Sequence, residues 1–115
     1  MEHEPPVQGT LKIDRDPAAA STGPPTFSLS GELDLSNAGH LVEAIQPFAI
    51  SGGEVILRLG RLDFMDSSGM RALLQIAQAL GPGGRLVIHS PSPAVAKVLE
   101  IVGANQFPGF AIVDA

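Results

Sequence analysis

Apolar and polar positions alternate along residues 26–35, and this period of two predicts a half-buried β-strand. The apolar members of the segment TFSLSGELDL are Phe27, Leu29, Leu33 and Leu35. We expect the strand to run into a turn at Gly31 and to end there. An earlier apolar stretch at residues 7–13 predicts a first strand, and the small and proline residues that follow predict a flexible loop over residues 14–25.

Short apolar runs predict three more strands further along the chain. These are residues 55–59, 86–88 and 110–113. We expect the first of them to be a central strand and the second to be buried as well.

Helical spacing of apolar residues predicts a helix after residue 36, with Ser36 as its N-cap. Its apolar face carries Leu41, Val42, Ile45 and Phe48. Because Pro47 cannot donate a backbone hydrogen bond, this helix is expected to kink or stop near Gln46.

Two further helices have clear start or stop signals. Leu73, Ile76, Ala77 and Leu80 recur at helical spacing, and the segment GPGG at residues 81–84 ends that helix. The last helix begins at Ser92, an N-cap followed by Pro93, and ends at Gly103. Its apolar stripe contains Val95, Val98, Leu99 and Val102.

Strands that alternate with helices from residue 26 onward pair in parallel through right-handed crossovers, whereas the first strand can form an antiparallel hairpin with the second. We therefore predict an α/β fold with a mixed, mostly parallel β-sheet, an antiparallel N-terminal edge strand and helices packed on the sheet. A chain of 115 residues with 44% hydrophobic residues can bury one core. We expect a single domain over residues 1–115 with a flexible N-terminus at residues 1–6.

The charge of the chain narrows the classes of partner. A net charge of -5 with seven scattered Lys and Arg residues opposes binding to nucleic acid or an anionic membrane, because both need clustered basic residues. The opening MEHEPPV lacks the basic and apolar regions of a signal peptide, and no stretch approaches the roughly 20 apolar residues of a membrane span. We expect a cytoplasmic protein.

The candidate chemistry lies in the segment DSSG, where the strand before it gives way to a helix. Helix N-termini favour hydroxyls, carboxylates and phosphates, because their first N–H groups lack internal partners. One interpretation is plain N-capping by Asp66 or a serine. A single cap needs only one such residue, however, so the run Asp66, Ser67, Ser68 leaves a spare hydroxyl that could accept a phosphoryl group.

Other sites have little support in the sequence. His3, His40 and His89 are scattered and no cysteine accompanies them, so we expect no metal site. Neither phosphate-binding motif, GxxxxGK[ST] or GxGxxG, is present, so no cofactor is expected and any nucleotide would come from a partner. Ser67 lacks the GxSxG setting of a serine hydrolase, which makes an enzymatic function the weakest of the hypotheses.

Three segments follow one another along the chain: GELDLSNAG at residues 31–39, LDFMDSSGMRALL at 62–74 and SPAVAKVLEIVG at 92–103. With these segments in this order, the chain resembles the STAS domain and, more narrowly, the bacterial anti-sigma factor antagonists. The resemblance covers roughly residues 7–115, and DSSG after an apolar strand is its most specific part. The loop over residues 14–25 is longer than the first hairpin of the small antagonists.

The resemblance implies a function. Members of that family bind an anti-sigma factor and so release a sigma factor for transcription. The serine directly after the aspartate is phosphorylated by the anti-sigma factor, which is a serine kinase using Mg-ATP, and a phosphatase reverses the reaction. The matching residue is Ser67, a substrate residue rather than a catalyst.

The resemblance also implies a partner-binding surface around Ser67. The expected members are Glu32, Asp34, Asp66, Ser68, Gly69, Met70 and Arg71. Asp66 would shape the acceptor loop, and Ser68 and Gly69 would set the helix start and allow a partner to approach closely. The alternative for Glu32, Asp34, Met70 and Arg71 is a solvated loop or helix surface. The alternative for the protein is a scaffold subunit of a transport or stress-signalling complex without sigma-factor control. The oligomeric state stays open.

Overall fold

The computed structural model describes residues 10–17 and 23–113. The strands within these ranges are β1 (Lys12–Arg15), β2 (Thr26–Leu33), β3 (Glu54–Met65), β4 (Arg85–His89) and β5 (Phe110–Val113). The α-helices are α2 (Ala38–Ile45), α3 (Ser67–Leu80) and α4 (Pro93–Val102), with short 3-10 turns η2 (Gln46–Phe48) and η3 (Ala104–Gln106).

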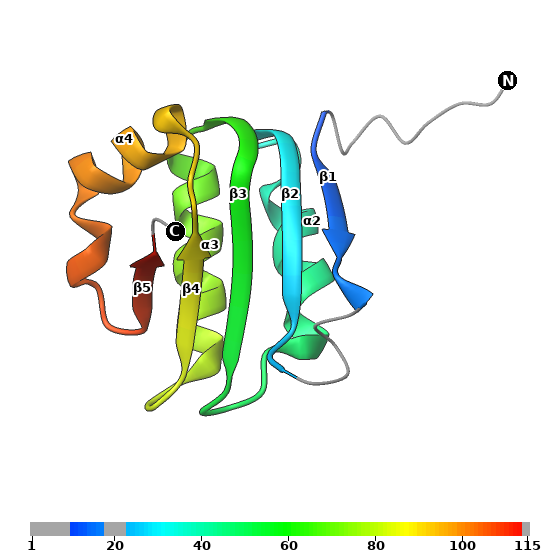
Figure 1. Ribbon diagram of the computed structural model, residues 1–115, viewed down its shortest axis with the longest axis vertical. Helices are drawn as coiled ribbons and strands as arrows, with labels where there is room; N and C mark the ends of the chain where they lie inside the picture. The colour runs from blue at the N-terminus through cyan, green and yellow to red at the C-terminus, as the bar shows by residue number, and fades with distance from the viewer. Residues whose placement is uncertain (1–9, 18–22, 114–115) are drawn as a thin grey trace, which may run out of the picture.

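The strands form one mixed sheet in the order β1-β2-β3-β4-β5 (Figure 1). The β1 strand pairs with β2 antiparallel, and every other pair is parallel. This confirms the predicted α/β fold with an antiparallel N-terminal edge strand.

Helices α2 and α3 lie against one face of the sheet, behind it in Figure 1. The core between them is formed by inward-facing leucines and isoleucines whose side chains are almost fully shielded from solvent. Its largest members include Leu29, Leu57, Leu59, Leu73, Ile76 and Leu80. Helix α4 lies instead at the upper left of Figure 1, where Ser92 N–H donates to Leu59 O at 3.1 Å and fixes the start of the helix beside β3.

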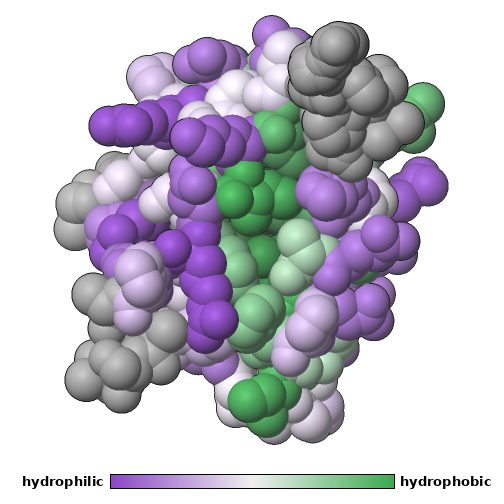
Figure 2. Space-filling view, turned by 90° about the vertical axis from the view of Figure 1, so that its right-hand side faces the viewer, coloured by the Kyte–Doolittle hydropathy of each residue, from purple (hydrophilic) through white to green (hydrophobic). Residues whose placement is uncertain are grey.

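Apolar side chains also gather in a band on the β1 side of the molecule (Figure 2). On this side Ile13 and Val42 pack against the core. Phe48 meets Phe27 edge to face with 5.4 Å between ring centroids, and the Arg15 guanidinium lies 4.2 Å from the Phe48 ring centroid. The edge strand and α2 thus close this end of the core.

The β2 strand is longer than predicted, because it continues through Gly31 to Leu33. Gly31 has a φ of +93°, and a Cβ there would lie 1.8 Å from Thr10 O. The pairing of β2 with β3 is irregular at this point, with a register shift between Gly31 and Glu32. The glycine therefore serves a bulge inside the strand rather than a turn at its end.

The predicted cap of the first helix is also corrected. Helix α2 begins after Asn37 rather than Ser36. The Ser36 hydroxyl donates to Asp34 Oδ1 at 2.6 Å, so it is used within the preceding loop. The end of α2 at Ile45, followed by the turn that contains Pro47, agrees with the predicted stop.

The central strand β3 spans twelve residues, more than the predicted 55–59. Gly60, Arg61 and Asp63 are exposed and resemble loop residues in hydropathy, yet they remain in the strand because two register shifts keep β3 paired with β2. The extra length carries the chain to Met65, directly before the DSSG segment.

The remaining boundaries follow the predictions closely. The structure confirms the helix stop at GPGG, the Ser92 cap of α4, the end of α4 at Gly103 and the strand at 110–113. The predicted 14–25 loop begins too early, since Asp14 and Arg15 belong to β1. Residues 18–22 of that loop and the N-terminus at residues 1–6 lie outside the described residues.

Within the described ranges, no helix has the length and hydrophobicity that crossing a membrane requires. In the same part of the chain, His, Asp and Glu side chains form no group that could hold a metal ion.

Candidate functional site

The DSSG segment lies at the carboxyl end of β3, where the chain enters α3 without an intervening loop. The backbone N–H of Asp66 donates to Leu33 O at 3.2 Å. This bond ties the start of α3 to the end of β2, so the polar segments that follow Leu33 and Met65 emerge next to each other.

Asp66 is the N-cap of α3. Its backbone is extended, and its Oδ1 accepts hydrogen bonds from the N–H groups of Ser68 at 2.9 Å and Gly69 at 3.1 Å. Two of the N–H groups that a helix start leaves without partners are therefore satisfied by one carboxylate oxygen.

Ser67 is the first residue of α3, and its side chain is exposed. None of the residues that the structure describes forms a hydrogen bond with its hydroxyl. Asp66 is thus the cap, and the spare hydroxyl belongs to Ser67. The hypothesis that a serine of this segment accepts a phosphoryl group requires this division. Ser68 is half-buried beside it.

Gly69, in the first turn of α3, is buried against the ends of β2 and β3. A Cβ at this position would lie 2.6 Å from Met65 Cγ and 2.8 Å from Leu33 Cγ, closer than side-chain carbons pack. The structure explains this glycine by internal packing, whereas its place in a partner-binding surface stays a prediction.

The segment after β2 is organised by Asp34, which is half-buried. Asp34 Oδ1 accepts a hydrogen bond from Ser36 N–H at 3.0 Å, and Asp34 N–H donates to Asn37 Oδ1 at 2.9 Å. The Asn37 amide donates in turn to the carbonyl of Glu32 at 3.0 Å. Asp34 therefore has a structural task in this loop, while the Glu32 side chain is exposed.

An apolar groove of about 360 Å³ lies beside Ser67, between the first turns of α3 and the apolar stripe of α4. Its apolar lining consists of Met65, Met70, Leu74, Val98 and Val102, and Asp66, Ser67 and Arg71 complete it. Met70 and Arg71 are the two predicted site residues on the first turn of α3. Met70 is only 5% exposed and forms part of the groove wall, whereas Arg71 reaches solvent.

The two α4 residues of the groove were absent from the predicted site. The sequence assigns Val98 and Val102 to the apolar stripe of α4, and only the packing of that helix against β3 brings them beside Ser67. Val102 retains 39% exposure, which is high for a residue on the buried stripe of a helix. The groove is therefore a feature of the tertiary structure.

Comparison with known proteins agrees with the fold described above. The family model of the STAS domain matches residues 17–113. The chain is 40% identical over 78 residues to BtrV of Bordetella bronchiseptica, which carries the name of an anti-sigma factor antagonist. That match covers 65% of the chain and 66% of BtrV, slightly less than two thirds of the relative's length.

Solved structures show the same fold. The unphosphorylated form of the anti-sigma factor antagonist SpoIIAA has a TM-score of 0.69 and 26% identity, with 88% of this chain and 87% of that chain covered. An anti-sigma factor antagonist from Mycobacterium paratuberculosis has a TM-score of 0.70 and 22% identity, with 95% and 90% covered. At 22% identity, the likeness to the Mycobacterium paratuberculosis protein concerns the fold alone. Because the family model matches most of the chain, and the fold agrees, the chain belongs to the STAS domain family.

Proposed function

We propose that this protein is an anti-sigma factor antagonist that binds an anti-sigma factor with serine kinase activity and is switched off when that kinase phosphorylates Ser67. The observation that carries the proposal is the exposed Ser67 hydroxyl at the start of α3, which has no hydrogen-bond partner among the described residues. Because Asp66 already caps the helix, Ser67 can be modified without removing the cap. The names of BtrV and SpoIIAA support the same assignment.

The groove beside Ser67 supplies a physical basis for binding. Met70, Val98 and Val102 present apolar atoms next to the hydroxyl, and an apolar side chain of the partner would be shielded from water there. Exposed Leu35, in the segment beside Asp66, would add to the same surface. Glu32 and Arg71 are exposed polar residues, which suits the rim of an interface.

Phosphorylation would weaken such a complex through charge and desolvation. A phosphate adds roughly 1.5 to 2 negative charges at neutral pH. On Ser67 these charges would lie one residue from the Asp66 carboxylate and at the edge of an apolar groove. A partner that packs closely against the unmodified surface would have to desolvate the phosphate, so we expect release.

In this mechanism the catalytic groups belong to other proteins. The partner kinase supplies Mg-ATP and transfers the phosphoryl group, and a phosphatase removes it, while this chain supplies the acceptor hydroxyl. The role places the protein in the cytoplasm, where sigma factors meet RNA polymerase.

Phosphate transfer is the direct test. The protein is incubated with the candidate anti-sigma factor and Mg-ATP, and the modified residue is located by mass spectrometry. We expect one phosphate on Ser67, none on a Ser67→Ala variant, and normal uptake by the matched Ser68→Ala variant. A phosphate that persists in Ser67→Ala would show that the acceptor is another residue.

Binding to the same partner tests the switch separately. Ser67→Asp introduces a single negative charge, and we expect it to weaken binding by tenfold or more in isothermal titration calorimetry, whereas Ser67→Ala should bind like the wild type. Equal binding by all three proteins, together with no phosphate uptake, would instead favour a STAS scaffold that docks constitutively.

A further inference from the structure

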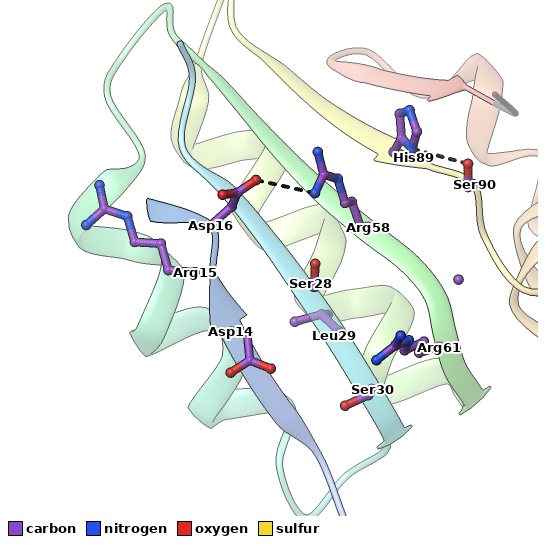
Figure 3. Close-up of a pocket in the computed structure, with 11 residues that line it drawn as sticks. Asp14, Arg15, Asp16, Ser28, Leu29, Ser30, Arg58, Arg61, His89 and Ser90 are labelled. Atoms are coloured by element: carbon purple, nitrogen blue, oxygen red, sulfur yellow. Dashed lines mark hydrogen bonds and ion pairs between the residues drawn. The ribbon is translucent and has the colours of Figure 1, made fainter. Parts of the chain in front are cut away.

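The sheet face opposite α2 and α3 contains a hollow of about 760 Å³ (Figure 3). Small groups contribute to its lining, because Ser28 and Ser30 point away from the core while their neighbours Phe27 and Leu29 are buried. Gly60 lines it without a side chain, and a Cβ there would lie 3.3 Å from Ser90 O. Ser28, Ser30 and Gly60 therefore leave space for the hollow on this face of the sheet.

Besides Arg15 of β1, whose guanidinium lies over the Phe48 ring, three basic side chains line the hollow from two adjacent strands. Arg58 is paired in register with Ser28 on one side and with His89 on the other, and Arg61 is paired with Ser30. Neighbours in register on one face of a sheet lie about 5 Å apart, so one small ligand can reach several of these groups. The concentration is notable in a chain with a net charge of -5.

Arg58, His89 and Arg61 differ in the hydrogen-bond and ion-pair partners that they already have. Arg58 Nη1 lies 3.3 Å from Asp16 Oδ2, and both side chains retain contact with solvent. The His89 Nδ1 atom lies 3.1 Å from Ser90 Oγ, which holds the imidazole in place. Arg61 is exposed and has neither an ion pair nor a hydrogen bond from its side chain to any described residue.

The acidic groups of the hollow lie on the opposite side. Asp14 is in β1, and Asp16 follows that strand directly (Figure 3). The hollow therefore has two carboxylates toward β1, the Arg58 and Arg61 guanidiniums toward β3 and the His89 imidazole toward β4. A ligand that fits this polarity carries a compact anion at one end and hydroxyl groups, which can donate to carboxylates, at the other.

We propose that this hollow binds a small phosphate monoester with a hydroxyl-bearing organic part, with the phosphate on Arg61 and the hydroxyl groups toward Asp14. A guanidinium matches phosphate oxygens in a bidentate geometry, and Arg61 is available for that contact. The acidic total charge opposes long polyanions such as nucleic acid but leaves room for one small anion. This site uses none of the residues around Ser67 and is independent of the proposed function.

The test is a titration of the ¹⁵N-labelled 115-residue chain at low salt, followed by amide shifts in NMR spectra. The probes are ribose 5-phosphate, inorganic phosphate and uncharged ribose. We expect ribose 5-phosphate to shift the amides of Ser30, Gly60 and Arg61 in a saturable way, with weaker binding of inorganic phosphate and none of ribose.

Two variants with the same chemical change separate a site from general charge attraction. Arg61→Gln should weaken the binding of ribose 5-phosphate by about tenfold or more, the loss expected for one charge-assisted contact to phosphate. Arg85→Gln removes the same charge at the far end of β4, outside the hollow, and should leave the affinity unchanged. Thermal unfolding of both variants checks that they are folded.

Other outcomes would overturn the proposal. Unsaturable shifts, or equal losses in Arg61→Gln and Arg85→Gln, would show unspecific attraction. Equal affinities for ribose 5-phosphate and inorganic phosphate would exclude the monoester and leave a site for the free ion alone.

Discussion

At the start of α3, the Asp66 side chain stabilises the helix, and the adjacent Ser67 side chain has an exposed hydroxyl that can be modified. The carboxylate of Asp66 faces the helix and accepts two N–H groups, whereas the hydroxyl of Ser67 faces solvent. A sequence can predict that such a segment begins a helix, because Asp and Ser are both good caps. It cannot decide which of the two caps, because that depends on the backbone angles at the strand end.

Removing the cap should therefore affect stability without removing the acceptor. We expect Asp66→Ala to lower the free energy of unfolding by about 1 kcal/mol, because the N–H groups of Ser68 and Gly69 lose their acceptor. Asp66→Asn keeps a side-chain oxygen and should lose much less. Urea unfolding followed by circular dichroism measures both, and an equal loss in the two variants would show that charge rather than capping matters.

Gly69 and Gly39 form a matched pair of helical glycines with opposite surroundings. An added Cβ would crowd Leu33 and Met65 at residue 69, whereas nothing lies within 4 Å of one at residue 39. We expect Gly69→Ala to destabilise the protein by about 1 to 3 kcal/mol through overpacking. Gly39→Ala should stabilise it by about 0.5 to 1 kcal/mol, because alanine favours the helix. Melting temperatures that shift in the same direction would contradict this explanation.

Helices and strands were predictable where their ends carry local signals. The stop of α3 at Gly81, the Ser92 cap of α4 and the proline after α2 all act within a few residues. The ends of β2 and β3 were missed because pairing between the two strands, with its register shifts, carries both past residues that resemble turns. Likewise, the groove beside Ser67 depends on where α4 packs, which no local pattern contains.

Ser92 links α4 to the strand that carries the site. Its Oγ donates to Leu62 O at 2.5 Å and accepts from Val95 N–H at 3.3 Å. We expect Ser92→Ala to destabilise the protein by about 1 to 2 kcal/mol, because the helix loses its cap and the buried carbonyl of Leu62 loses its donor. Ser92→Thr retains the hydroxyl and should recover most of the stability. Chemical denaturation measures both variants; a threonine variant as unstable as the alanine variant would point to packing instead.

The chain as a whole folds around one sheet whose two faces differ. One face is sealed by α2 and α3 over a single leucine-rich core, and part of the other is open and polar. A shared core predicts that all described elements unfold together, as expected for one domain. The fold class was accessible from the order of strands and helices, whereas the hollow of Figure 3 was not, because its residues come from separate strands.

Two leucines test this cooperativity. Leu57 is fully buried in β3, whereas Leu35 is 80% exposed. We expect Leu57→Ala to cost about 2 to 5 kcal/mol and still show one transition, and Leu35→Ala to change stability by less than about 0.5 kcal/mol. Circular dichroism and NMR intensities recorded across a urea series provide independent probes. Transitions that do not coincide would reveal separately unfolding parts.

The turn at Gly81–Gly84 lies at the opposite end of α3 from Ser67, about 20 Å away along the helix. Its Pro82 is exposed, and the chain contains no cysteine. A Pro82→Cys variant would therefore carry a single thiol, far from the acceptor hydroxyl. A fluorophore attached there would follow the tumbling of the protein as it joins or leaves a larger complex, without covering the surface on which that complex forms.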